Sequence, residues 1–168
     1  MRRRGVEEEW SVEDLDVLLR GAVTNLDESL LCHQAGAPHA ALVSLAGAFE
    51  ATLLGMVVSH EDELRAAERW PAQPSFLHLT ELAELAHQVG WLPELVTSEV
   101  IDLLNKVRTM AAHPGAHVRA VRQVPDLDLT DPAGYAAVYD VVVRASRALF
   151  VALPGVSALG TTAPVPET

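Results

Sequence analysis

The chain has very few cysteines and aromatic residues. Cys32 is the single cysteine among 168 residues, so no disulfide can form within the chain, which is typical of proteins from a reducing cytosol. Aromatic side chains make up 5% of the sequence, whereas hydrophobic residues make up 49%. Ala, Leu and Val dominate that fraction. The length and this composition predict one domain whose core is built by packing aliphatic helices.

Positive charge is also scarce. The chain carries 12 Lys and Arg against 23 Asp and Glu, and its formal net charge is -11. Nucleic-acid-binding proteins usually have a basic face, so this balance argues against a broad nucleic-acid surface, although it is compatible with a small cationic cleft. No segment was expected to span a membrane, and Glu7–Glu9 follow Arg2–Arg4 where a signal peptide would be apolar. We therefore expect a cytoplasmic protein without membrane contact.

The sequence contains no convincing cofactor or metal motif. It has no glycine-rich phosphate-binding loop. His113 and His117 are four residues apart, but Pro114 and Gly115 interrupt the helix that would bring them onto one face, and no third ligand is apparent. We therefore expect no cofactor and no bound metal.

Helical periodicity runs through most of the chain. Ser11 is suited to an N-cap, with acidic residues in the turn that follows. Residues 1–10 are expected to be a flexible N-terminus, residues 11–153 the domain, and residues 154–168 a disordered tail. The fold predicted is an all-α bundle of four to five helices. The helices are expected at residues 12–33, 38–69, 76–89, 93–112 and 133–153, with a long connection at residues 114–132.

The strongest candidate for chemistry is an arginine and a histidine near the end of the fourth of these helices. Arg108 precedes His113 with four residues between them. An arginine grips a phosphoryl group with a planar fork of donors, and a histidine transfers protons near neutral pH. The spacing alone means little, because about one such pair is expected by chance in a chain of this composition. On an ideal helix the two side chains differ by about 140°, so a site would need the last turn to unwind before Pro114 or a second copy of the helix.

The sequence around this pair resembles the HEPN domain family, in particular its branch of small prokaryotic helical domains. The similarity covers roughly residues 12–153 and is best from Val107 to Gly115, where Arg108, a polar residue and then His113 match the family signature. The helix around Glu50 also resembles the second helix of that branch. Thr109 stands where asparagine is common, and Gly115 stands where some toxin members carry tyrosine.

The resemblance implies a metal-independent endoribonuclease that acts as a homodimer, in bacterial defence or a toxin–antitoxin-type system. In such an enzyme a ribose 2′-hydroxyl attacks the adjacent phosphate and leaves a 2′,3′-cyclic phosphate. His113 would transfer protons and Arg108 would stabilise the charged phosphorane. Asn105, Thr109 and Lys106 would position the substrate, which is RNA.

An alternative is a non-catalytic HEPN-like helical module that dimerises or binds a protein partner, such as an antitoxin, and regulates or assembles a larger complex. Glu50 bears on the choice. It is either a supporting partner of Arg108 or a structural carboxylate that pairs with some cation. Convergence of Arg108 and His113 from two protomers would favour the enzyme, whereas an Arg108–Glu50 salt bridge would favour the module. A small-nucleotide binder, in which Arg108 grips a phosphate, is a third class.

Overall fold

A computed structural model describes residues 9–92, 100–112, 114–123 and 129–152 of the chain. Within these residues the structure is all-α and contains no strand, as the sequence predicts. Of the ends expected to be flexible, residues 1–8 of the range 1–10 and all of residues 154–168 lie outside the described residues. The helices are α1 (Val12–Gln34), α2 (Pro38–Ser59), α3 (Glu61–Ala66), the short 3₁₀-helix η1 (Pro74–Phe76), α4 (Leu79–Gln88), α5 (Asp102–Ala112), α6 (Pro114–Gln123) and α7 (Pro132–Ala152).

The first helix begins where its sequence indicates. The Asp14 N–H donates to the Ser11 hydroxyl at 3.1 Å, and the Ser11 N–H donates to the Asp14 carboxylate at 2.9 Å. These reciprocal bonds satisfy amide groups that have no partner within a helix. The bond from the Ser11 backbone also lowers the pKa of Asp14, since it stabilises the ionised carboxylate. The predicted N-cap at Ser11 is therefore confirmed.

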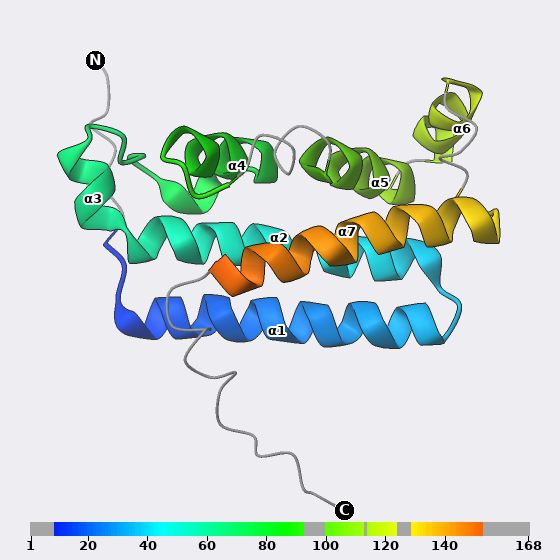
Figure 1. Ribbon diagram of the computed structural model, residues 1–168, viewed down its shortest axis with the longest axis horizontal. Helices are drawn as coiled ribbons and strands as arrows, with labels where there is room; N and C mark the ends of the chain where they lie inside the picture. Colours follow the sequence, from blue (N-terminus) through cyan, green and yellow to red (C-terminus); the bar gives the residue numbers. More distant parts are fainter. Residues whose placement is uncertain (1–8, 93–99, 113, 124–128, 153–168) are drawn as a thin grey trace, which may run out of the picture.

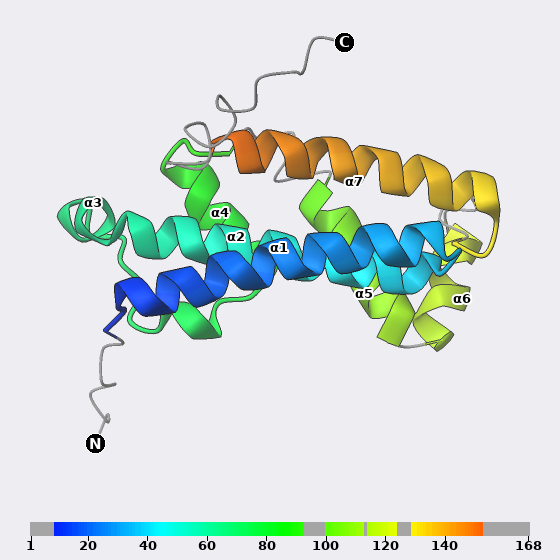
Figure 2. The ribbon, with the colours of Figure 1, turned by 90° about the horizontal axis from the view of Figure 1, so that it is seen from below.

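Helix α2 forms the centre of the bundle. It runs antiparallel to α1, while α4 and α5 lie on its other side and α7 crosses over it (Figures 1 and 2). Most of its side chains are apolar and many are fully buried, as in a helix that other helices surround. The largest buried side chains of the whole core are those of Phe49, Leu42, Leu45, Leu53, Leu64, Leu79, Leu82, Ile101, Leu104, Leu129 and Val57.

The same helix bears on the expectation that no segment spans a membrane. At 22 residues and a mean hydropathy of 1.9 in its most apolar stretch, α2 is long and apolar enough to cross a membrane, and it is the one such helix among the described residues. However, 61% of that stretch is buried inside the protein. A buried core helix meets the same criteria as a membrane span, so this finding is weak evidence for a membrane.

The second predicted helix is divided in the structure. The helix expected at residues 38–69 ends at Ser59, and α3 begins after His60. At this break the Ser59 hydroxyl donates to the Gly55 carbonyl at 2.7 Å, and His60 Nδ1 bonds the Met56 carbonyl at 2.8 Å. Such side-chain bonds satisfy the carbonyls of a last helical turn and favour its termination.

The connection expected at residues 114–132 contains a further helix. Helix α6 begins at Pro114 and packs against α5. Proline has no amide hydrogen to donate, so it breaks a helix interior but suits a first helical position. The interruption at Pro114 was predicted, whereas the helix that begins there was not.

The helix expected at residues 76–89 is also divided. Residues 74–76 form η1, and α4 starts at Leu79. Gly90 follows α4 with a φ of 81°, the left-handed conformation that glycine adopts readily. The sequence predicts that this helix, expected at residues 76–89, stops before Gly90, and α4 ends at Gln88. Of the helix expected at residues 93–112, residues 93–99 lie outside the described part of the chain.

Candidate functional site

Arg108 of α5 forms an ion pair with Glu50 of α2. The Arg108 Nη1 atom lies 2.7 Å from the Glu50 Oε2 atom, and the side chains are 51% and 32% exposed. Glu50 is the only Asp, Glu, Lys or Arg residue of α2. The structure brings the two together at the edge of the α2–α5 contact, where both reach solvent.

This ion pair has two consequences for chemistry. A solvent-exposed pair contributes little to stability, on the order of 1 kcal/mol or less. It does orient the guanidinium, and it places a carboxylate where an incoming phosphate would have to bind. Among the described residues, the bond from Nη1 to Glu50 is the one hydrogen bond that the Arg108 side chain makes. Glu50 therefore orients the guanidinium of Arg108 and at the same time partly neutralises its positive charge.

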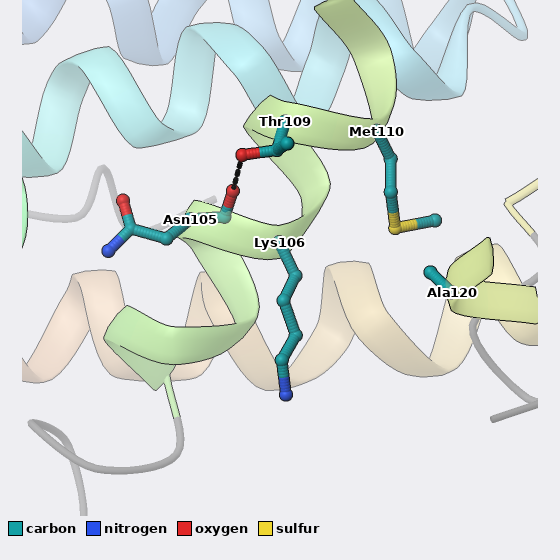
Figure 3. A pocket seen from close by; sticks show the side chains of 5 residues that line it. All are labelled: Asn105, Lys106, Thr109, Met110 and Ala120. Carbon is teal, nitrogen blue, oxygen red and sulfur yellow. Dashed lines mark hydrogen bonds between the residues drawn. The ribbon is translucent and has the colours of Figure 1, made fainter. Parts of the chain in front are cut away.

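Asn105, Lys106 and Thr109 line a different surface of α5 (Figure 3). Together with Met110 and with Ala120 of α6 they surround a shallow cavity of about 270 Å³. Arg108 is not part of this lining, because it projects from α5 about 100° away from Thr109. The residues expected to act together thus fall into two groups.

Two of the residues that line this cavity are occupied by internal bonds. The Asn105 side-chain amide donates to the Thr80 hydroxyl at 2.5 Å, which ties α5 to α4. The Thr109 hydroxyl donates to the Asn105 carbonyl at 2.8 Å within α5 (Figure 3). Lys106 extends its amino group away from these residues. Of the predicted positioning residues, Lys106 is the one best placed to meet an anion.

His113 lies outside the described residues, so its relation to Arg108 stays a prediction. A second hollow, of about 340 Å³, lies beside the ion pair and is lined by Glu50 with apolar or small residues of α1 and α2. Its other lining residues are Leu18, Gly47, Ala51 and Leu54. Within the described ranges, no group of three or more His, Cys, Asp or Glu side chains is arranged to hold a metal ion.

The structure also shows an aromatic cluster that the sequence analysis missed. His33 of α1 shares a 2.7 Å hydrogen bond with the Tyr135 hydroxyl and stacks on Tyr139, with ring centroids 4.2 Å apart. Burial, together with Tyr139 and Cys32 nearby, raises the pKa of Tyr135 to about 12. The i, i+4 spacing of the tyrosines placed them on one face of a helix. Nothing in the sequence indicated that the end of α1 would meet that face.

Comparison with known proteins gives no match: no family model, no curated protein and no solved structure is significantly similar to this chain. The resemblance to HEPN domains therefore stays a prediction from the sequence around Arg108 and His113 and around Glu50.

Proposed function

We propose that the protein is a non-catalytic HEPN-like helical module that binds a protein partner and serves to regulate or assemble a larger complex. The observation that carries this proposal is the Arg108–Glu50 ion pair. It gives the most distinctive residue of the signature a structural partner within the fold. It is also the contact that we expect of a module rather than of an enzyme.

The electrostatics support the same proposal. Phosphodiester cleavage needs a positive charge placed against the phosphorane oxygens. Here a carboxylate oxygen lies 2.7 Å from the guanidinium, and the whole chain has a net charge of -11. Glu50 would repel the phosphate that Arg108 has to bind, and the long-range field would oppose the approach of RNA.

A metal-independent endoribonuclease is the second candidate. It is favoured by the exposure of Arg108, whose side chain is 51% accessible and has donors beyond the one that Glu50 binds. In that function Glu50 would hold the guanidinium in place, Lys106 would attract the backbone, and His113 would transfer protons. Asn105 and Thr109 would contribute less, since their side chains are already hydrogen-bonded within the protein.

Cleavage of a mixed RNA pool in EDTA separates the two candidates. The full chain, His113→Ala and Arg108→Ala would be compared with Arg20→Ala, which removes another exposed arginine that forms an ion pair, with Asp16 at 2.9 Å. The module should leave the RNA intact in all samples. Cyclic phosphate ends that appear with the wild type and Arg20→Ala, and vanish with the other two variants, would overturn the proposal in favour of the ribonuclease.

Three further features are proposed from the resemblance to HEPN domains. They are a homodimer, a cytoplasmic location and a role in bacterial defence or beside an antitoxin. Sedimentation of the full chain over a range of concentrations tests the homodimer. A monomer at all concentrations would remove the dimer from the proposal and leave the partner-binding function.

A further inference from the structure

Helix α1 exposes a continuous apolar stripe. Val12, Leu19, Val23 and Leu30 are 81%, 38%, 55% and 51% exposed. Their spacing of seven, four and seven residues places all four within an arc of about 40° at 100° per residue. The stripe is about 27 Å long at a rise of 1.5 Å per residue. This is the seam spacing by which helices pair with other helices.

The stripe is separate from the face of α1 that packs on the bundle. Ala22 and Ser29 are buried against α2, and they project about 80° to 100° from the stripe. Leu19 lies at the border, because its Cδ2 atom would be 3.8 Å from a Cβ placed on Gly55. Leu26 is partly buried against the core on the same side. The apolar surface thus extends beyond what the described helices cover.

The charges beside the stripe are mainly acidic. Asp16 and Asp27 are exposed and project about 40° and 60° from the centre of the stripe. Arg20, on the same flank, is already paired with Asp16 at 2.9 Å. A partner that binds this surface therefore contacts the apolar stripe and the negative charges along one side of it.

The acidic residues beside the stripe distinguish between possible binding partners. A second copy of the chain would bring the same acidic flank, and like charges that meet across an interface are unfavourable. Residues 153–168 of this chain carry no Lys or Arg, so this segment offers no cation to the aspartates beside the stripe. An anionic membrane surface would be repelled by the same aspartates. A partner helix whose own apolar face is flanked by Lys and Arg complements both the stripe of α1 and the aspartates beside it.

We propose that the exposed stripe of α1 is the docking site for a basic amphipathic helix of a partner protein. This inference rests on the proposed function as a binding module, because it names the class of partner that the module takes. The contact would be a helix pair, with Val23 and Leu19 near its centre and the partner's cations beside Asp16 and Asp27. The Arg108 surface takes no part in it.

The test is a titration of the full chain with labelled helical peptides of about 18 residues, long enough to cover the stripe. One peptide carries Leu at seam positions and Lys on the flanks, and a second has Glu in place of Lys. Val23→Asp is compared with Val17→Asp, because Val17 is similarly exposed, at 59%, but projects about 120° away. Asp27→Lys is compared with Glu28→Lys, which lies about 100° further round the helix.

The expected result is that Val23→Asp weakens binding of the Lys peptide at least about tenfold, as loss of a central anchor does. Val17→Asp should change it less than about twofold, and Asp27→Lys should weaken it more than Glu28→Lys does. The proposal is overturned if the Lys peptide does not bind, if both valine variants bind equally, or if the Glu peptide binds as well. Self-association lost only in Val23→Asp would assign the stripe to a second copy instead. RNA cleavage by the wild type would refute the module function without changing any of these peptide results.

Discussion

The two longest neighbouring helices, α1 and α2, differ sharply in how they use apolar residues. They have 23 and 22 residues and pack side by side (Figure 2). Helix α2 buries residues around most of its circumference, whereas the fully buried residues of α1 are Ala22 and Ser29. Apolar residues at helical spacing therefore lie in the core in α2, whereas many of those in α1 are exposed on the surface. We infer that α2 holds the fold together and that α1 serves recognition.

The largest effect expected from this comparison concerns stability. Phe49→Ala in α2 should lower the free energy of unfolding by about 3 to 5 kcal/mol, because it leaves a cavity in the core. Leu31→Ala in α1 should change it by about 0.5 kcal/mol or less, since Leu31 is 64% exposed. Urea unfolding of both variants measures the difference. Similar losses would mean that α1 is buried in solution.

The contact between the two helices can be examined with two glycines of α2. A Cβ at Gly47 would lie 2.9 Å from the Asn25 Nδ2 atom, so Asn25 would have to move. At Gly55 the nearest atom would be the Leu15 Cδ1 at 3.6 Å, an ordinary contact. Gly55→Ala should therefore raise the free energy of unfolding by up to about 1 kcal/mol through helix propensity. Gly47→Ala should gain less or lose stability. Thermal unfolding that ranks them in reverse would contradict this packing.

The Arg108–Glu50 ion pair between α2 and α5 should contribute much less to the free energy of unfolding than the buried side chain of Phe49. A double-mutant cycle with Glu50→Gln and Arg108→Gln should give a coupling energy of about 1 kcal/mol or less, because both side chains reach solvent. The cycle is measured by urea unfolding at low and at high salt, and the coupling should shrink with salt. A coupling well above that range would show that the pair between α2 and α5 is buried in solution.

An effect that appears only at high pH is expected at the end of α1 where it meets α7. The pKa of Tyr135 is raised to about 12 from an ordinary value of 10.0. The folded state therefore holds this proton more tightly than the unfolded state. As a result, the free energy of unfolding should fall as the pH rises from about 10 towards about 12.

The ultraviolet absorbance of tyrosinate follows this titration directly, since the chain contains 2 tyrosines. Tyr135→Phe should remove the component that titrates near pH 12. If the variant keeps a component at that pH, the shifted hydroxyl belongs to another residue.

Much of the fold could be predicted from local patterns, because capping and helical periodicity act over a few residues. The all-α class, the start of α1 at Ser11 and the stop at Gly90 were correct for that reason. The break at His60 was missed because the charged residues that follow it are equally compatible with a continuous helix. Helix α6 was missed because proline both ends and begins helices.

The candidate site was predictable only in part. Arg108 was singled out by its spacing to His113 and Glu50 by its place in an apolar helix, and the two side chains are in contact. The split between Arg108 and the residues that line the α5–α6 cavity depends on helix orientation in the bundle. The stripe on α1 could not be recognised, because periodicity shows that a face is apolar but not what covers it.

Hydrogen–deuterium exchange of the full chain, alone, with the Lys-flanked peptide and with RNA, tests the central claim most directly. If α1 is the recognition surface and α5 a structural element, the peptide should slow exchange in residues 12–34, and RNA should leave residues 102–112 unchanged. Slower exchange in residues 102–112 with RNA, and none in α1 with the peptide, would contradict the account and place the function at Arg108.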